Sequence, residues 1–224
     1  MIAIAFALPQ ESQDFRRILA AAGGRLGGEE IRVVHLGVGP EAAATTAARL
    51  LAEDRPGLLS CAGFAGGLDP RLVTGDLVVA ENFSAPDFVA RCQELAVEID
   101  GCFIGPLVSR GVPIESSAEK SALAGETGAL AVDMETAAVA EACSAAGVPL
   151  LAVRVISDPA SVPLPVPFAE WFDVQRQCPR RWGLVKYLML HPNRIGPFAD
   201  FIRGLKPARR ALTDFLLRFM NSSA

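Results

Sequence analysis

The sequence contains few of the residues that staple small secreted domains or hold metal ions. Its five cysteines are scattered over 224 residues without a Cys-x-x-Cys pair, which argues against a disulfide framework and a structural zinc site. Only two histidines, His35 and His191, are present, so a histidine-based metal site is not expected. We therefore predict that the protein holds no metal ion, and as a separate expectation we predict no organic cofactor.

Long apolar runs and aromatic residues are also scarce. No run is long enough to cross a bilayer as a helix. Aromatic residues make up 7% of the chain although 51% of it is hydrophobic, mainly Ala, Val and Leu, which suits helices packed on a mostly parallel sheet. The apolar segment 2–6 lacks a preceding basic residue and is interpreted as a buried strand, not a signal peptide, so a cytoplasmic location is expected.

Strand-like and helix-like segments alternate along the first 160 residues. Strands are predicted at 2–6, 31–36, 58–61, 76–80, 129–132 and 149–156, and helices at 11–22, 41–53 and 135–146. This order predicts an α/β fold with three layers, in which a mixed central sheet is flanked by helices. Extra C-terminal helices are expected to follow this core.

The chain changes character after residue 160. Residues 161–224 are predicted to form a Pro-rich loop and basic amphipathic helices at 182–190 and 198–220, packed on the same domain as the core, 1–160. The second helix is expected to be interrupted near Gly204 and Pro207. Residues 176–218 carry ten Lys and Arg against two Asp. Such helices either contact an anionic membrane surface or simply expose solvated charges; without a recognisable motif, nucleic acid is not expected.

Two glycine-rich segments follow predicted strands. The segment 37–42 fits the G-x-G-x-x-A pattern of dinucleotide-binding turns, but no acidic residue for a ribose follows the next strand, so a tight turn is preferred. The segment 63–67 is interpreted as a second turn, which either lets a ligand approach the backbone closely or only bends the chain. Ligands bind at strand ends in open α/β sheets.

Three acidic residues are predicted to lie near strand ends. Glu11 follows the first strand, Glu135 begins a helix, and Asp158 ends an apolar strand. Each also has an ordinary structural explanation, because acidic residues stabilise helix N-termini and cap turns. Glu135 and Asp158 would nevertheless meet at one edge of the sheet and form a candidate site.

Four blocks in order resemble the nucleoside phosphorylase and nucleosidase superfamily. Residues 132–140 followed by 148–158 are similar to the signature of methylthioadenosine/S-adenosylhomocysteine nucleosidases. Residues 62–68 with 75–79, residues 36–39, and the first strand with Glu11 resemble the other family blocks. The closest resemblance is to hopanoid-associated phosphorylases, through Gly66-Gly67-Leu68-Asp69-Pro70 and the residues around 127–135.

The resemblance implies a role for individual residues. Met134 packs on the ribose and Glu135 binds its hydroxyls, while Asp158 protonates N7 of the purine or shares a proton with it, and Glu11 activates water. The remaining implied contacts with substrate come from Ser157, Gly63, Phe64, Ala65 and the backbone at Ile114. Arg154 pairs with an acid near the site or serves the fold alone. A carboxylic acid at the base and a carboxylate near the sugar suit N-glycosidic cleavage, which makes the base negative and the ribose positive.

The expected function is cleavage of the N-glycosidic bond of a purine nucleoside, of the 5′-substituted adenosine type. Hydrolysis is preferred over phosphorolysis, in which inorganic phosphate would be the co-substrate, because no arginine set for phosphate is recognised. Resemblance to the hopanoid-associated enzymes adds a lipid-linked nucleoside in hopanoid biosynthesis as a substrate, and family relatives imply a homo-oligomer. The alternative is a non-catalytic nucleoside- or lipid-binding protein of the same fold, with Phe64 blocking the nucleophile site.

Overall fold

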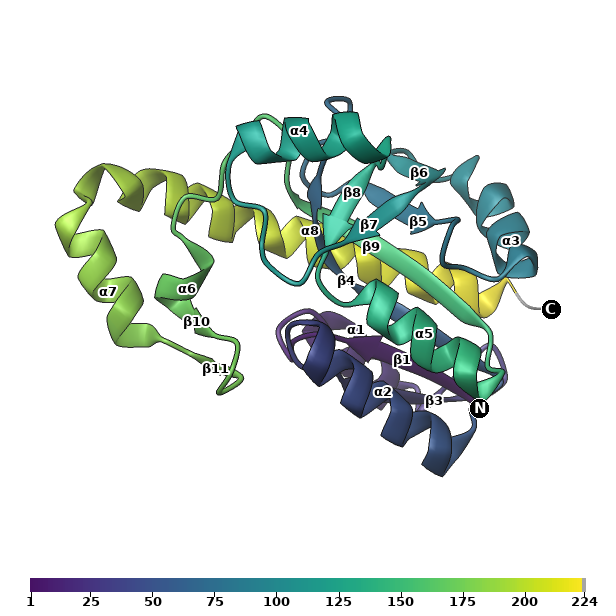
Figure 1. Cartoon of the computed structure of the whole chain (residues 1–224). Coiled ribbons are helices and arrows are strands. Elements are labelled where there is room, and N and C mark those ends of the chain that lie inside the picture. The colour runs from purple at the N-terminus through teal and green to yellow at the C-terminus, as the bar shows by residue number, and fades with distance from the viewer. Residues whose placement is uncertain (223–224) are drawn as a thin grey trace.

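The computed structural model describes residues 1–222 as a central sheet with helices on both faces (Figure 1). The main sheet strands are β1 (Ile2–Phe6), β2 (Arg25–Leu26), β3 (Glu29–His35), β4 (Leu58–Gly67), β5 (Leu77–Ala80), β6 (Cys102–Gly105), β7 (Leu107–Ser109), β8 (Ala131–Asp133) and β9 (Leu150–Asp158). Their order is β2-β3-β1-β4-β9-β5-β6, and β8 joins β4 to β7 at a branch. Parallel and antiparallel pairs both occur, so the predicted mixed sheet is confirmed.

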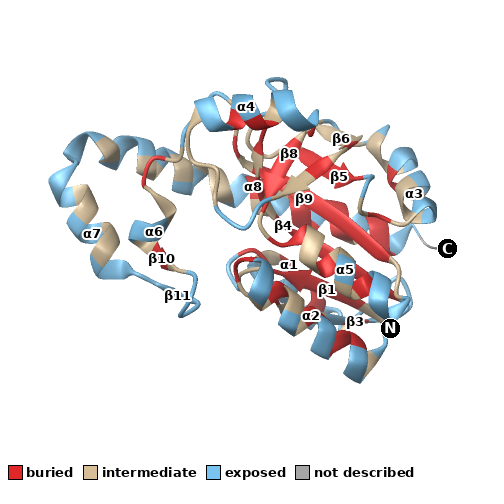
Figure 2. Ribbon diagram, viewed as in Figure 1, coloured by how far each residue is buried: buried red, intermediate tan, exposed pale blue. Residues whose placement is uncertain are grey.

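Helices cover the two faces of the sheet differently. The helices are α1 (Gln13–Ala21), α2 (Pro40–Asp54), α3 (Pro86–Ala96), α4 (Ser117–Thr127), α5 (Thr136–Ala146), α6 (Phe168–Trp171), α7 (Arg181–Leu190), η1 (Pro192–Arg194) and α8 (Ile195–Asn221). Side chains of β1 alternate between the faces: Ile4 and Phe6 pack in a core with α1 and α8, and Ala3 and Ala5 in a core with α2 and α5. Figure 2 shows that the strands between these layers are mostly buried.

Strand β4 is longer than the sequence pattern predicts. The prediction ended a strand at Cys61 and placed a turn at 63–67, and this was wrong, because the glycines continue β4 as far as Gly67. The first part of β4 pairs with β1, its end pairs with β8, and β9 pairs with it from Leu59 to Gly66. Glycine inside a strand marks the close approach of another group. The approaching groups are two acidic side chains, Glu11 next to Gly63 and Asp158 next to Gly66.

A bulge interrupts the pairing of β4 with β9 near its end. Ala65 lies opposite Ile156 and Gly66 opposite Asp158, so Ser157 is the extra residue on β9. A bulge of this kind changes the direction in which the following side chain points. It brings Ser157 and Asp158 to the edge of the sheet where β4 and β8 also end.

The C-terminal segment divides into a projecting group and a core helix. We call residues 168–194 the arm; it contains α6, the small hairpin of β10 (Phe172–Asp173) and β11 (Cys178–Pro179), α7 and η1. Figure 1 shows the arm to one side of the sheet, and Figure 2 shows α7 without buried residues. Helix α8 leads from the arm back to the sheet.

Helix α8 is continuous, so the predicted interruption near Gly204 and Pro207 was wrong. Proline removes one backbone donor, but the part of α8 after Pro207 is held by the core, where Leu212, Phe215 and Phe219 are buried. Gly204 lets the helix approach Thr74, since a Cβ at this glycine would lie 3.2 Å from the Thr74 methyl group. In residues 1–222, no helix is both long and apolar enough to cross a membrane.

Candidate active site

A cavity of about 380 Å³ opens where β1, β4, β8 and β9 end. Carboxylates line its inner wall, whereas the arm and the first half of α8 form a largely apolar outer wall. Apolar pockets with a few convergent polar groups are typical binding sites for small molecules. We therefore identify this cavity as the candidate active site.

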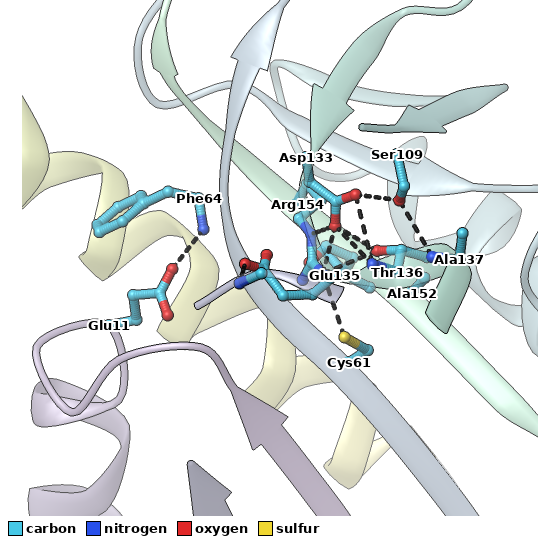
Figure 3. Close-up of polar contacts among 12 residues, drawn as sticks. Glu11, Cys61, Phe64, Ser109, Asp133, Glu135, Thr136, Ala137, Ala152 and Arg154 are labelled. Carbon is cyan, nitrogen blue, oxygen red and sulfur yellow. Dashed lines mark hydrogen bonds and ion pairs between the residues drawn. The ribbon is translucent and has the colours of Figure 1, made fainter. Parts of the chain in front are cut away.

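Glu11 lies in the turn between β1 and α1 and is only 5% exposed. Its Oε1 accepts a hydrogen bond from the Phe64 N–H at 2.9 Å (Figure 3), and its Oε2 accepts one from the Leu8 N–H at 2.7 Å. Burial raises the pKa of Glu11, while these two N–H groups lower it. A Cβ at Gly63 would lie 2.8 Å from Oε1, so a glycine here leaves room for the carboxylate.

Glu135 is the N-cap residue of α5, and Met134 precedes it on the cavity wall. Oε1 of Glu135 accepts a hydrogen bond from the Gly39 N–H at 2.7 Å. Gly39 has a φ of 91°, which favours glycine, so the predicted tight turn presents its backbone donor to a carboxylate. Burial, followed by the negative charge of Asp133, raises the pKa of Glu135 to about 7. This carboxylate therefore changes charge near neutral pH.

A buried polar network fixes the start of α5 beneath Glu135. Asp133 accepts a hydrogen bond from Arg154 Nε at 2.8 Å, and Arg154 Nη2 donates to Thr136 Oγ1 at 2.8 Å. Ser109 donates to the other Asp133 oxygen (Figure 3). Arg154 therefore pairs with Asp133, an acid on the cavity wall, and this buried ion pair fits both predicted alternatives, an acid near the site and a structural ion pair. Because every member is hydrogen-bonded, the network holds Met134 and Glu135 in place.

Asp158 occupies another part of the cavity wall, after the bulge in β9. Ser157 Oγ donates to its Oδ1 at 2.5 Å, and Lys120 Nζ donates to its Oδ2 at 2.5 Å. Burial raises the pKa of Asp158, whereas Lys120 and Ser157 lower it. A Cβ at Gly66 would lie 3.3 Å from Oδ2, so β4 approaches this carboxylate closely as well.

The structure gathers the predicted site residues in one cavity. Glu11, Phe64, Ala65, Ile114, Met134, Glu135, Ser157 and Asp158 line it. Gly63 stands behind Glu11 and provides space. Phe64 lies beside Glu11, but Figure 3 shows its ring pointing away from Glu135, and part of the ring packs against the core that contains α8.

Several functional positions were missed from the sequence. Lys120 lies in α4, a helix that was not predicted, and only its neighbours Ser116 and Glu119, which form a capping box, gave a local signal. Gln177 holds the backbone of Val38 through both of its amide atoms, at 2.7 and 2.8 Å, which no local pattern reveals. Aromatic residues of the arm also form part of the wall: Phe168, Trp171 and Phe172.

The apolar side of α8 was noted from the sequence, and two uses were considered for it, contact with a membrane surface and contact with a lipid substrate. The structure places Phe198, Phe201, Ile202 and Leu205 on the cavity wall. Among the described residues, no Lys, Arg or His lines the cavity. Within residues 1–222, no group of three His, Cys, Asp or Glu side chains is arranged to hold a metal ion.

Buried carboxylates around an apolar cavity, at the strand ends of an α/β sheet, define an enzyme site for acid–base chemistry on a small molecule. The model of the phosphorylase superfamily matches residues 9–178, and the chain belongs to this superfamily. The predicted family and the predicted enzyme class are thereby confirmed.

Solved structures share the fold at low sequence identity, two of them over the whole chain and one over part of it. The S-adenosylhomocysteine nucleosidase of Streptococcus pyogenes, bound to 5-methylthiotubericidin, is 22% identical, with a TM-score of 0.73 over 100% of this chain and 97% of that chain. The 5′-methylthioadenosine/S-adenosylhomocysteine nucleosidase of S. pneumoniae is 20% identical, with a TM-score of 0.72 over 100% and 99%. A futalosine hydrolase mutant of Helicobacter pylori is 23% identical, with a TM-score of 0.59 over 70% and 89%.

Proposed function

We propose that this enzyme hydrolyses the N-glycosidic bond of a purine nucleoside of the 5′-substituted adenosine type. The observation that carries this proposal is the placement of Glu11, Glu135 and Asp158 around one cavity. Cleavage of this bond needs proton donation to the base and negative charge near the sugar. The nucleosidases with the same fold, whose ligands are nucleoside analogues, add support for this substrate class.

Each residue then has a defined part in the reaction. Glu135 accepts hydrogen bonds from the ribose hydroxyls, and Met134 packs on the sugar. The C–N bond breaks with its electron pair moving to the base, where a proton arrives through Asp158. Glu11 takes a proton from water, and the remaining hydroxide forms the new bond to the ribose carbon. Ile114 contributes backbone contacts to the base, and Ser157 orients Asp158.

Water is favoured as the nucleophile over phosphate because the cavity is acidic. Glu11 and Glu135 line it, and no lining residue in the described chain is cationic. A phosphate dianion would be desolvated beside like charges, which is strongly unfavourable. Water avoids this cost and matches the hydrogen-bonded position of Glu11.

The outer wall favours a large apolar group at the 5′ position. Phe168, Trp171, Phe198, Phe201 and Leu205 belong to this wall. Burial of apolar surface contributes roughly 25 cal/mol per Å², so a long hydrocarbon chain would gain far more than a methylthio group. A lipid-linked nucleoside, such as an intermediate of hopanoid biosynthesis, fits this wall.

The arm supports an additional proposal of contact with a membrane surface. Trp182 and Met189 on α7 are 84% and 77% exposed, and Arg180, Arg181 and Arg194 lie nearby in the chain. Exposed apolar groups with adjacent cations bind anionic bilayers. Stronger sedimentation with anionic than with zwitterionic vesicles supports this contact, and equal sedimentation opposes it. A cytoplasmic location and a homo-oligomeric state stay predictions.

A binding protein without turnover is the second candidate, because Phe64 lies beside Glu11 on the cavity wall. Release of free adenine from adenosine, methylthioadenosine and a 5′-alkyl adenosine with a long chain separates the two functions. If the protein is an enzyme, adenine is released catalytically, and the long-chain compound has the highest kcat/KM of the three. Tight binding without release would establish the second candidate instead.

A further inference from the structure

Lys120 is fully buried, with 0% of its side chain exposed, although it carries a charged group. An ammonium ion in a protein interior is costly unless it is paired and all its hydrogens are bonded. Lys120 comes from α4 and reaches the end of β9, where Asp158 is located. A simple fold would place an apolar residue at such a position, so the lysine needs a specific explanation.

The contacts of Lys120 are directed at Asp158 and at the loop behind it. Nζ lies 2.5 Å from Asp158 Oδ2 and contacts the backbone oxygens of Asp158, Pro159 and Val162 at 3.3, 3.0 and 2.9 Å. Ser157 donates to Oδ1, so both carboxylate oxygens of Asp158 accept hydrogen bonds. An ionised carboxylate fits this arrangement, but it has no proton of its own for the base.

We infer that Lys120 supplies the proton that Asp158 delivers to the leaving base, so that Lys120 acts on the reaction through Asp158 and does not itself touch the substrate. This inference rests on the proposed glycosidic cleavage. As the C–N bond breaks, Lys120 Nζ gives a proton to Asp158 Oδ2, the base takes that proton, and Asp158 is again a carboxylate. The lysine becomes a neutral amine.

The protons balance over one turnover. Glu11 receives one proton from the attacking water and releases it to solvent, and Lys120 regains one through Asp158, which lines the cavity. The net reaction is water plus nucleoside giving free base and free sugar. Lysine suits this exchange because its ammonium group can lose a proton in a buried site, whereas an arginine cannot.

Two substitutions separate proton supply from simple positioning. Lys120→Arg preserves the positive charge next to Asp158 but cannot give up a proton. We expect about a 100-fold fall in kcat, the usual scale of a lost general acid, with KM changed less than about twofold. Unchanged kcat in a folded Lys120→Arg variant would overturn the inference, because a positioning charge alone would then be sufficient.

Lys120→Met leaves Asp158 as a lone buried carboxyl group that must hold its own proton. In this variant Asp158 can donate to the base only while it is itself protonated. We therefore expect the alkaline limit of the kcat–pH profile to move to lower pH by at least about one unit, because this limit is then set by the pKa of Asp158 and no longer by the loss of the Lys120 proton. A general loss of activity with an unshifted alkaline limit overturns proton supply and indicates a structural role. Thermal melting of both variants identifies any that fail to fold.

A measurement that does not depend on turnover is needed if a variant fails to fold. It also separates the proposed glycosidic cleavage from the proposed proton supply by Lys120. The ¹³C signal of the Asp158 carboxyl group, assigned with Asp158→Asn, is followed against pH in the wild-type protein. An ionised Asp158 at pH 7 supports the ion pair, and a protonated one overturns the inference. If the wild-type protein releases no base from any nucleoside, the proposed function and the proton transfer both fail, while this titration still decides the state of the pair.

Discussion

At the scale of single residues, the site depends on carboxylates that are buried but differently paired. Asp158 is held by a cation, Glu11 by two backbone N–H groups, and Glu135 by one N–H beside a second acid. Groups with the same chemistry acquire different protonation behaviour from such surroundings. Each carboxylate is therefore predicted to respond differently to substitution and to pH.

Replacement of Asp158 by Asn is expected to remove proton delivery to the base while keeping the side-chain shape. We predict a fall in kcat of about 100-fold or more. The amide oxygen can still accept from Lys120, which limits structural damage, and circular dichroism checks the fold. Normal turnover by a folded Asp158→Asn variant would rule out its role.

Glu135 is expected to make the protein less stable at alkaline pH. Its pKa is raised to about 7 in the folded state, compared with an ordinary value of 4.5, so the folded protein holds the extra proton between these values. Stability therefore falls as pH rises through this window, by about 3 kcal/mol for the whole shift.

Melting temperatures of the wild-type protein and Glu135→Gln at pH 5 and pH 8 test this effect. The wild-type protein should melt lower at pH 8, because the buried carboxylate is then charged beside Asp133. The amide of the variant can still accept from the Gly39 N–H but carries no charge, so the variant should lose much of this difference. An identical pH dependence in both proteins contradicts the assigned electrostatics.

At the scale of elements, β4 and α8 do most to shape the cavity. Strand β4 passes between the acidic residues, and its glycines leave room for Glu11 and Asp158. Helix α8 contributes one half to the cavity wall and the other half to the core. Substitutions within one element are thus predicted to have separate effects on activity and on stability.

Gly63→Ala should displace Glu11 more than it disturbs the fold. The new Cβ would lie 2.8 Å from Glu11 Oε1, and this side chain must move away from the N–H groups that hold it. We expect kcat to fall at least about tenfold, since misplacement of a base by about 1 Å has such effects. Gly125→Ala is a matched control, because the Cβ that it adds would have no neighbouring atom within 4 Å.

The two halves of α8 should respond differently to the same change. Phe215→Ala removes a side chain from the core and is expected to lower the free energy of unfolding by about 3–5 kcal/mol. Phe201→Ala lies at the cavity wall and should instead raise KM for a nucleoside with a long 5′ chain, with little effect on methylthioadenosine. An equal rise in KM for both substrates would show that the long 5′ chain does not bind against Phe201.

Periodicity predicted the elements with strong local patterns and failed where distant contacts decide the structure. The N-terminal strand, α2 and α5 lie close to the predicted ranges. Strand β4 was cut short because glycine weakens strand propensity locally, and its extension depends on β8 and β9. The predicted helix break at Pro207 was wrong because burial of the second half of α8 outweighs the one hydrogen bond that proline removes.

At the scale of the whole molecule, residues that are far apart in the chain form one site. Glu11 and Asp158 were found because each lies next to a predicted strand within a sequence block that resembles the family. Lys120 was not found, because its partner is 38 residues away and the fold alone brings them together. The C-terminal segment completes the cavity, so its apolar residues serve the site as well as the surface.

The central claim is hydrolysis by water activated at Glu11. Its most direct test is adenine release from a 5′-substituted adenosine in phosphate-free buffer, by the wild-type enzyme and by Glu11→Gln. We predict release without phosphate, free sugar as the second product, and a loss of about 100-fold or more in kcat in the variant. Release only in the presence of phosphate, with a sugar 1-phosphate as product, would contradict the account.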